Sequence, residues 1–258
     1  GGNATRHADL FADKDGVRTV IEVKARLDDP IYESLLPAIN SKGGATYQTG
    51  SGKTNSFSGK VKEAAAQLKA SAGDNDFRCL WFLISDNQFA DVGEQIQGTL
   101  LGRRYLLGAR EDDPDGTVNS DPCYVLSRAD FYRYPEIDAA VIDFLDRGSL
   151  VLNPASPRYS QAADWPLWKV FNSQDAVKDI LTEEKTKKAY LLPRGLQVKS
   201  DQDILDEIRK RYGIKDLLTF FDPVTFGAVT QIKRNGRPNH RIEPPGAERI
   251  APAAHPWR

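Results

Sequence analysis

The sequence lacks the features that mark several broad classes of protein. It has no methionine and two cysteines, Cys79 and Cys123, which are too few for a disulfide framework or a four-ligand zinc site. The longest apolar runs, such as 79-CLWFLI-84, are far too short to cross a bilayer. A net charge of -1, from 35 basic and 36 acidic residues, excludes a generally basic nucleic-acid-binding chain. We therefore expect a cytoplasmic globular protein with reduced cysteines and no membrane contact.

The absence of methionine bears on the spacing of motifs. Average usage would give roughly five methionines in a chain of this length. Either sequence upstream of Gly1 is missing, or methionines have dropped out of the chain as written. The number of residues between two motifs is therefore given to within about one residue.

Residues 8–25 have the pattern of a β-hairpin. A loosely alternating segment, 8–13, is followed by a turn that contains Gly16 and then by 17-VRTVIEVKA-25, which is rich in β-branched residues. Because successive side chains of a strand point to opposite faces, Glu22 and Lys24 share one face of the second strand.

The rest of the chain predicts an α/β fold with a mixed sheet flanked by helices. The apolar run 77–86 predicts a central strand buried on both faces, and the Ala-rich segment 60–72 predicts a helix with one buried stripe. The other predicted elements are a helix at 30–39, an exposed loop at 40–59, a helix at 90–108, a strand at 122–127, an amphipathic helix at 136–148, and a helix at 201–213 with Ser200 and Asp203 at its cap.

Composition suggests where the chain divides. Residues 1–152 are predicted to form the core, and the Pro-, Ser- and Ala-rich segment 153–166 is predicted as a linker. Residues 167–258 are predicted as a smaller, mainly helical subdomain with an irregular tail from 233. Such a tail would be disordered alone or would lie along the surface of a partner. The partner of this C-terminal region would be either a second copy of the chain or a different subunit.

The hairpin also carries the residues with the clearest chemistry. It places Asp9 on one strand and Glu22 on the next, and two converging carboxylates can hold a hard cation such as Mg²⁺. Lys24 emerges beside Glu22, where it can hold a hydroxide or a phosphate oxygen that the metal also touches. This arrangement is suited to hydrolysis of phosphodiester bonds.

Residues 8-ADLFADKDGVRTVIEVK-24 resemble the PD-(D/E)xK nuclease superfamily, also called restriction-endonuclease-like. The superfamily pattern is Asp, then Glu-x-Lys on adjacent strands, followed by a helix and a central strand. The resemblance covers roughly the first 130 residues. It departs from the pattern at Ala8, where proline is usual, and at Ser71, where some branches have tyrosine four residues after a helix glutamine.

The resemblance implies an activity and a set of roles. It implies a nuclease that uses Mg²⁺ or Mn²⁺ to hydrolyse DNA, as enzymes of restriction, repair or defence do. Asp9 and Glu22 would bind the metal together with the carbonyl of Val23. Lys24 would position the attacking water, and Gln67, which matches the helix glutamine, would orient Lys24 or a phosphate.

A local surplus of basic residues fits a nucleic-acid substrate. Residues 41–70 hold five lysines against one acid, Glu63, and two arginines follow at 103–104. The predicted phosphate contacts are Lys53, Lys60, Lys62, Arg103 and Arg104. The alternative is that these are solvated helix residues with no ligand.

Two other functions compete with the nuclease. The string 48-QTGSGKT-54 resembles motif I of helicase-type ATPases, whose glycine-rich loop holds nucleotide phosphates. A strict P-loop requires glycine where this chain has Tyr47, and it requires a buried strand just before the loop. A third reading is a nuclease-like module that binds DNA or a protein without catalysis, although such a module has no chemical reason to retain Asp9, Glu22 and Lys24 together.

Overall fold

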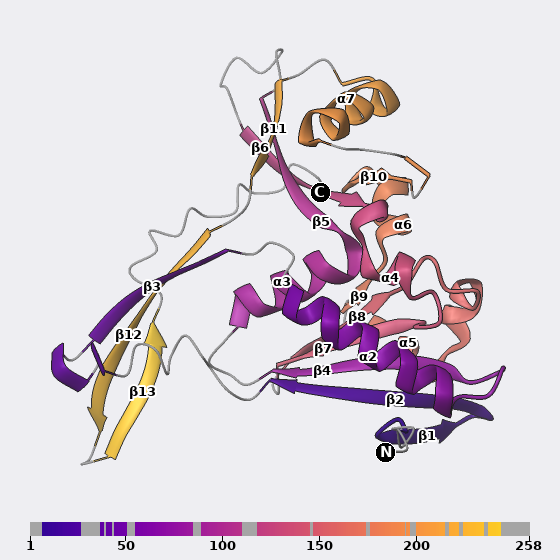
Figure 1. Cartoon of the computed structure of the whole chain (residues 1–258), viewed down its shortest axis with the longest axis horizontal. Helices are drawn as coiled ribbons and strands as arrows, with labels where there is room; N and C mark the ends of the chain where they lie inside the picture. Colours follow the sequence, from indigo (N-terminus) through magenta and orange to yellow (C-terminus); the bar gives the residue numbers. More distant parts are fainter. Residues whose placement is uncertain are drawn as a thin grey trace, which may run out of the picture. The chain divides into compact units, whose positions relative to one another are not determined.

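A computed structural model describes most of the chain and divides it into two units (Figure 1). Unit 1 comprises Gly1–Leu27 and Ser51–Pro223, and unit 2 comprises Asp28–Gly50 and Val224–Arg258. The described residues are 7–26, 37–38, 40–42, 44–50, 55–84, 89–109, 118–144, 147–173, 176–193, 195–196, 200–214, 217–221, 224–234 and 237–243. The division therefore falls at three points in the sequence, near residues 27, 50 and 223.

Unit 1 is built on a mixed six-stranded sheet. Its strands in spatial order are β1 (Leu10–Lys14), β2 (Val17–Arg26), β4 (Phe77–Ile84), β7 (Ala139–Asp143), β8 (Gly148–Leu152) and β9 (Val177–Lys178). The central strands β2, β4 and β7 are parallel, whereas β1 and β8 run antiparallel to their inner neighbours. Helices flank this sheet, so the predicted α/β class with a mixed sheet is confirmed.

The N-terminal hairpin forms as the sequence predicts. In the ladder of β1 and β2, Leu10 lies opposite Ile21 and Lys14 lies opposite Val17. Asp15 and Gly16 connect the strands with φ angles of 55° and 77°, the left-handed conformation that two-residue hairpin loops require. This turn fixes the register and therefore the faces on which the residues of β2 lie.

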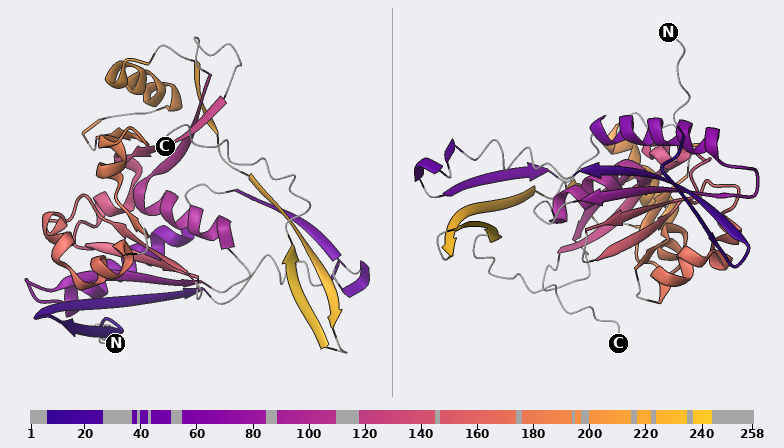
Figure 2. Two further views of the ribbon diagram at one scale, coloured as in Figure 1. Left: turned by 180° about the vertical axis from the view of Figure 1, so that it is seen from behind. Right: turned by 90° about the horizontal axis from the view of Figure 1, so that it is seen from below.

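Helices cover both faces of the sheet (Figure 2). On one face lie α2 (Asn55–Ser71), α3 (Phe89–Leu101) and α4 (Asp130–Arg133), and on the other lie η3 (Tyr159–Asp164) and α5 (Pro166–Asn172). The apolar residues of α2 recur at helical spacing and are fully buried with Val20 and Leu80 of the strands; they are Phe57, Val61, Ala64, Ala65 and Leu68. The alternate residues of the same strands, such as Ile21 and Cys79, pack on the opposite side with Trp165.

The segment 136–148 is a correction to the sequence prediction, because it forms no amphipathic helix. It contains β7 instead, and β8 begins at Gly148. Ala140 and Ile142 pack on the α2 side of the sheet, while Ala139 and Val141 pack on the other side. A short apolar run buried on both faces is compatible with either a helix or a strand, and here pairing with β4 favours the strand.

The predicted helix at 90–108 also ends earlier than expected. The helix α3 stops at Leu101, and Gly102 follows with a φ of 64°. A Cβ atom on Gly102 would lie 2.4 Å from the carbonyl oxygen of Val125, so only glycine fits this close approach. The chain then enters strand β5, which continues to Ala109.

A second sheet in unit 1 has four strands and one packed helix. Its order is β10 (Tyr190–Leu192), β6 (Val118–Val125), β5 (Arg103–Ala109) and β11 (Leu217–Phe221). The short helices η2 (Leu126–Arg128) and α6 (Ile180–Lys185) lie near it, and α7 (Asp201–Tyr212) buries Ile204 and Ile208 against it. The cap of α7 forms as predicted, with a reciprocal pair of hydrogen bonds between Ser200 and Asp203.

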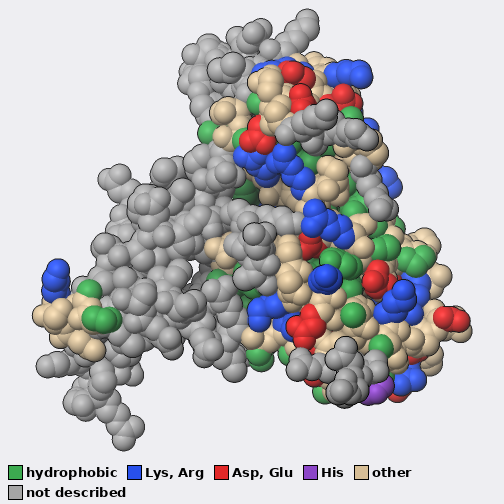
Figure 3. All heavy atoms as spheres, viewed as in Figure 1, with side chains coloured by type: hydrophobic (Ala, Val, Ile, Leu, Met, Phe, Trp, Pro, Cys, Tyr) green, Lys and Arg blue, Asp and Glu red, His purple; other side chains and the backbone are tan. Residues whose placement is uncertain are grey.

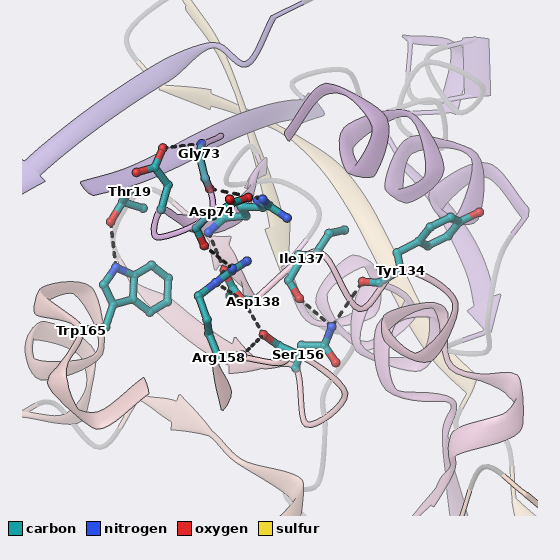
Figure 4. A network of polar contacts seen from close by, with 12 residues as sticks. Thr19, Gly73, Asp74, Tyr134, Ile137, Asp138, Ser156, Arg158 and Trp165 are labelled. Atoms are coloured by element: carbon teal, nitrogen blue, oxygen red, sulfur yellow. Dashed lines mark hydrogen bonds and ion pairs between the residues drawn. The ribbon is translucent and has the colours of Figure 1, made fainter. Parts of the chain in front are cut away.

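The segment 153–166, expected as a linker, lies inside unit 1. The side chain of Asn153 donates to the carbonyl of Ile137 at 2.6 Å, and the indole of Trp165 donates to the Thr19 hydroxyl at 2.8 Å. Figure 4 shows the polar network of which Ser156 is a member. The Pro, Ser and Ala content of the segment suggested an exposed connection, but Asn153, Ser156, Ala162 and Trp165 are buried in unit 1.

Unit 2 contains an antiparallel three-stranded sheet. Its order is β13 (Arg237–Glu243), β12 (Val224–Arg234) and β3 (Gly44–Gly50). The polar segment 40–59 was expected to be a loop, yet part of it forms β3 and α2 already begins at Asn55. The partner of β3 is distant in sequence, since Gly50 lies opposite Val224, and no local pattern signals this pairing.

Two further expectations concern segments near these strands. The tail from 233 was expected to be irregular, whereas β12 extends to Arg234 and β13 follows. The helix at 30–39 falls mainly outside the described residues. Among the helices that the structure describes, none combines the length and the apolar character needed to cross a membrane.

Candidate active site

The candidate site begins at the open end of the N-terminal hairpin. Because Leu10 lies opposite Ile21, the antiparallel register places Asp9 opposite Glu22, one step beyond the ladder. Asp9 accepts a hydrogen bond on Oδ2 from the Val23 amide at 2.8 Å. The preceding residue, Ala8, donates its amide to Ser71 Oγ at 2.7 Å. These bonds hold the exposed Asp9 carboxylate beside the second strand.

Glu22 and Lys24 lie on the face of the sheet that α2 covers. Lys24 Nζ donates to Glu22 Oε1 at 2.8 Å and to Gln67 Oε1 at 3.0 Å. Glu63 Oε1, one helical turn before Gln67, is 3.6 Å from the same nitrogen. The structure therefore brings together the four predicted catalytic residues, with β2 and α2 supplying the oxygens around one ammonium group.

Glu22 is buried without full satisfaction of its carboxylate. Its side chain is 2% exposed, and Oε2 has no hydrogen-bond partner among the described residues. Burial raises the pKa of Glu22, the ion pair with Lys24 opposes that rise, and the charges of Asp9 and Glu63 add to it. An unpaired buried carboxylate oxygen is costly, so a cation or a hydrogen-bond donor from outside the chain would stabilise it.

The donors at this site fit a small hard cation. Asp9 and Glu22 provide two carboxylates, and Val23 follows Glu22 with a main-chain carbonyl. Within the described ranges, no group of three or more His, Cys, Asp or Glu side chains could hold a metal ion. Mg²⁺ commonly binds through one or two carboxylates and keeps several waters. The feature that favours such an ion here is Glu22 Oε2, for which the described part of the chain supplies no partner.

The predicted lysine contacts lie on or near α2. Lys62 is exposed and Lys60 is partly exposed, and both precede Glu63 and Gln67 on the same helix. Lys53 lies outside the described residues. Figure 3 shows the basic side chains of this face as separate groups with acidic side chains among them. These lysines are available at the surface without forming one continuous basic patch.

Arg103 and Arg104 are engaged in contacts within the protein. Arg103 forms an ion pair with Glu94, whose carboxylate also accepts from Tyr105. Arg104 Nη1 lies 2.7 Å from Asp201 Oδ2, and its guanidinium lies 4.0 Å from the centre of the Phe220 ring. These contacts join α3 to β5 and β5 to α7 and β11. The geometry favours a structural role for both arginines over a phosphate contact.

Two residues near the site were not predicted to take part. Glu63 approaches Lys24. It lies four residues before Gln67 on one helix, and this spacing is the sequence signal that places the two side chains next to each other. Ser71, four residues further, binds the amide of Ala8 and so helps to fix the segment that carries Asp9. No sequence signal links Ser71 to Ala8, because the contact joins positions 63 residues apart.

The competing phosphate loop has an unfavourable setting. A P-loop follows a strand of a parallel sheet, and its backbone amides turn inward to hold phosphates. Here the first residues of 48–54 continue strand β3, with Gln48 opposite Phe226 and Gly50 opposite Val224 in an antiparallel ladder. Residues 51–54 lie outside the described ranges. The described part of the motif thus has the pairing of a sheet strand.

Comparisons with known proteins identify no relative: no family model, curated protein or solved structure matches the chain.

Proposed function

We propose that the protein is a divalent-metal-dependent nuclease that hydrolyses phosphodiester bonds of DNA. The observation that carries this proposal is the buried Oε2 of Glu22, which has no partner among the described residues, with Asp9 and Lys24 beside it. A site that leaves a carboxylate oxygen unsatisfied in the protein alone is suited to a ligand that completes it. The buried free thiols of Cys79 and Cys123 support a cytoplasmic location.

Each residue of the site has a chemical role in this proposal. Asp9 and Glu22, with the carbonyl of Val23, would hold Mg²⁺ or Mn²⁺. The ion would supply positive charge that polarises the phosphate and lowers the pKa of a bound water. The protein supplies the positions of these donors, which the hairpin register and the Asp9–Val23 hydrogen bond fix.

Lys24 is placed to act on the phosphate and on water. In hydrolysis a water oxygen bonds to phosphorus, the bond to one sugar oxygen breaks, and that oxygen takes up a proton. An ammonium group has three donors and no acceptor, so Lys24 can hold the water oxygen and stabilise negative charge on the phosphate. Gln67 Oε1 accepts a hydrogen bond from Lys24 Nζ at 3.0 Å and thereby fixes the direction of the lysine side chain.

The test is cleavage of plasmid and linear DNA by the full chain with Mg²⁺ or Mn²⁺. We expect cleavage by the wild type and a loss on the order of 10²-fold or more in Glu22→Gln and in Lys24→Ala. Asp13→Asn changes an exposed carboxylate of the same hairpin and should leave cleavage unchanged. Equal products from wild type and Glu22→Gln would overturn the assignment.

The same preparations distinguish the ATPase alternative. The nuclease proposal predicts that ATP does not change the melting temperature of the wild type. In a P-loop, Lys53 would contact the β and γ phosphates, so Lys53→Ala would abolish ATP binding. ATP binding that is lost in Lys53→Ala, together with an absence of DNA cleavage, would replace the nuclease proposal.

A further inference from the structure

The ammonium group of Lys24 is surrounded by oxygens of the protein itself. Its nitrogen lies 2.8 Å from Glu22 Oε1, 3.0 Å from Gln67 Oε1 and 3.6 Å from Glu63 Oε1. An ammonium group has three N–H donors and no acceptor. The three donors therefore already face three oxygens. A phosphate oxygen that Lys24 is to hold must take the place of one of them.

The three oxygens are not held equally. Those of Glu22 and Gln67 are within hydrogen-bond distance of the nitrogen, whereas Glu63 Oε1 lies beyond it and forms only an ion pair. The side chain of Glu22 is 2% exposed, and that of Glu63 is 47% exposed. An exposed ion pair contributes little to stability, because water screens it and because fixing two long side chains costs entropy. Glu63 is therefore the partner that Lys24 can exchange at the smallest cost.

Glu63 is also the partner that faces solvent. The side chain of Lys24 is 13% exposed, and of the three residues around its nitrogen Glu22 is buried and Gln67 is partly buried. Glu63 lies on α2, directly after the exposed Lys62. The solvent-facing carboxylate beside Lys24 is thus that of Glu63, at the side from which a ligand would reach the ammonium group.

The charges at this point oppose an anion. Asp9 is placed opposite Glu22 by the hairpin register, and Glu63 lies beside Lys24, so three carboxylates gather near one ammonium. A phosphate that bound while Glu63 kept its place would add a further negative charge. Carboxylate and phosphate oxygens accept hydrogen bonds from the same cationic donors. The carboxylate of Glu63 and a phosphate oxygen therefore compete for one position at Lys24.

We infer that the Glu63 carboxylate occupies the position of a phosphate oxygen at Lys24 and is displaced when the backbone of a nucleic acid binds. One donor of Lys24 passes from Glu63 to the phosphate, while Glu22 and Gln67 keep theirs. Glu63 thereby lowers the affinity of the free site for the nucleic acid. The choice of DNA as the ligand rests on the proposed function, whereas the geometry around Lys24 does not.

The first measurement is DNA binding by the full chain in EDTA, where cleavage does not interfere. Glu63→Gln removes the charge and keeps the size of the side chain. We expect this variant to bind a labelled DNA duplex about fivefold more tightly than the wild type, the effect of one unit charge about 4 Å from another in water. Glu63→Asp keeps the charge and should bind the duplex about as tightly as the wild type.

Two variants separate this effect from a general loss of negative charge. Asp164→Asn removes an exposed carboxylate of η3, on the opposite face of the sheet, and should leave the affinity for DNA unchanged. In Lys24→Ala no ammonium group holds a phosphate at this position, so adding Glu63→Gln to that variant should not raise the affinity. Circular dichroism and melting show whether each variant folds.

The second measurement is cleavage of the same duplex with Mn²⁺. A residue that competes with the substrate acts mainly on KM, whereas one that orients Lys24 in the transition state acts on kcat. We expect Glu63→Gln to lower KM about fivefold, with a smaller change in kcat. The Kd for Mn²⁺, followed by melting, should rise by less than about tenfold, the smallest loss expected when a group that supports a metal ligand is removed.

The outcomes distinguish this inference from the proposed function. Equal DNA affinities of the wild type and Glu63→Gln, or an equal gain in Asp164→Asn, would overturn the inference even if the wild type cleaves DNA. A fall in kcat that exceeds the fall in KM would make Glu63 a positioning residue, and a larger loss of Mn²⁺ affinity would assign it to the metal site; either result would also overturn the inference. A gain in affinity that requires Lys24, in a protein that does not cleave DNA, would support the inference and reject the nuclease.

Discussion

Two buried carboxylates, Glu22 in the six-stranded sheet and Asp138 just before one of its strands, have opposite surroundings. Asp138 is 5% exposed, and both of its oxygens accept hydrogen bonds (Figure 4). Oδ1 accepts from the Ser156 hydroxyl and from Arg158 Nε at 3.1 Å. Oδ2 accepts from Arg158 Nε at 3.0 Å and from the Arg78 amide at 2.7 Å. Asp138 is therefore satisfied by the protein alone.

Glu22 is buried to a similar degree but is not satisfied. It is 2% exposed, Oε1 accepts from Lys24 at 2.8 Å, and Oε2 has no partner among the described residues. Both carboxylates have a basic partner, so an ion pair alone does not distinguish a structural site from a functional one. The difference lies in the unused oxygen, which a bound ligand can complete.

The two carboxylates also lie at different ends of the parallel strands. Asp138 precedes the first residue of β7 and binds the amide of Arg78 near the start of β4. Glu22 and Lys24 are the sixth and eighth residues of the ten-residue strand β2. In open α/β sheets, ligands bind near the carboxyl ends of the strands. The position of each carboxylate thus agrees with its pattern of hydrogen bonds.

The largest effect expected from this comparison is on stability at the satisfied site. Asp138→Ala would leave the mostly buried guanidinium of Arg158 without its carboxylate, which costs about 3–5 kcal/mol. Unfolding by urea at neutral pH measures this loss. Asp13→Ala removes an exposed carboxylate and should change stability by less than about 0.5 kcal/mol. Similar losses in both variants would contradict the structural role of the Asp138 network.

Metal should act on the unsatisfied site and not on the satisfied one. Binding to the folded state alone adds about 2.7 kcal/mol at a hundredfold excess of Mn²⁺ over its Kd. We expect a rise in the melting temperature of the wild type that disappears in Asp9→Ala and in Glu22→Ala. Asp13→Ala should retain the rise. A melting temperature that Mn²⁺ does not change in the wild type would remove the basis for a metal site.

The candidate site could be predicted because its parts are close in sequence. Asp9 and Glu22 belong to one hairpin, and its turn and its alternation of side chains between two faces are local signals. The helix that carries Gln67 is marked by apolar residues at helical spacing. The burial of Glu22 and its unpaired oxygen could not be predicted. They depend on how α2 packs on β2, which is a property of the folded chain.

The errors in the fold arise from contacts that the sequence does not show. Strand β3 pairs with β12, which is more than 170 residues away, so its polar sequence suggested a loop. The apolar run in β7 is compatible with helix or strand until its pairing with β4 is known. The segment 153–166 is polar because its groups bind Asp138, Ile137 and Thr19 inside unit 1.

A smaller effect concerns the pH dependence of stability. Burial raises the pKa of Glu22 above its usual value of 4.5, so the folded protein retains this proton more strongly than the unfolded chain does. The stability that protonated Glu22 contributes is present below the unfolded pKa and is lost as the pH rises through the folded pKa. In EDTA, the wild type should therefore lose stability relative to Glu22→Gln as the pH rises from 4.5 through the raised pKa of Glu22.

Urea unfolding of both proteins across this range measures the difference. Asp13→Asn serves as the control, because it replaces an exposed carboxylate of the same hairpin. Saturating Mn²⁺ should reduce the loss in the wild type, since a cation beside Glu22 favours its charged form. A difference between wild type and Glu22→Gln that grows in favour of the wild type as the pH rises would show that the carboxylate is satisfied after all.

The smallest effect is expected at the contact that fixes the segment before β1. Ser71 Oγ accepts from the amide of Ala8, which is 7% exposed, so Ser71→Ala should cost about 1 kcal/mol of stability. Its effect on the site should be larger than its effect on the fold, because Ala8 immediately precedes Asp9. We expect the Kd for Mn²⁺, followed by melting, to rise about tenfold, as it does when a group that orients a ligand is removed. Ser173→Ala, which removes an exposed helix-end hydroxyl, should change neither quantity. If Ser71→Ala loses stability but its Kd for Mn²⁺ is unchanged, the hairpin register alone positions Asp9. Ser71 would then stabilise the fold without a role in the metal site.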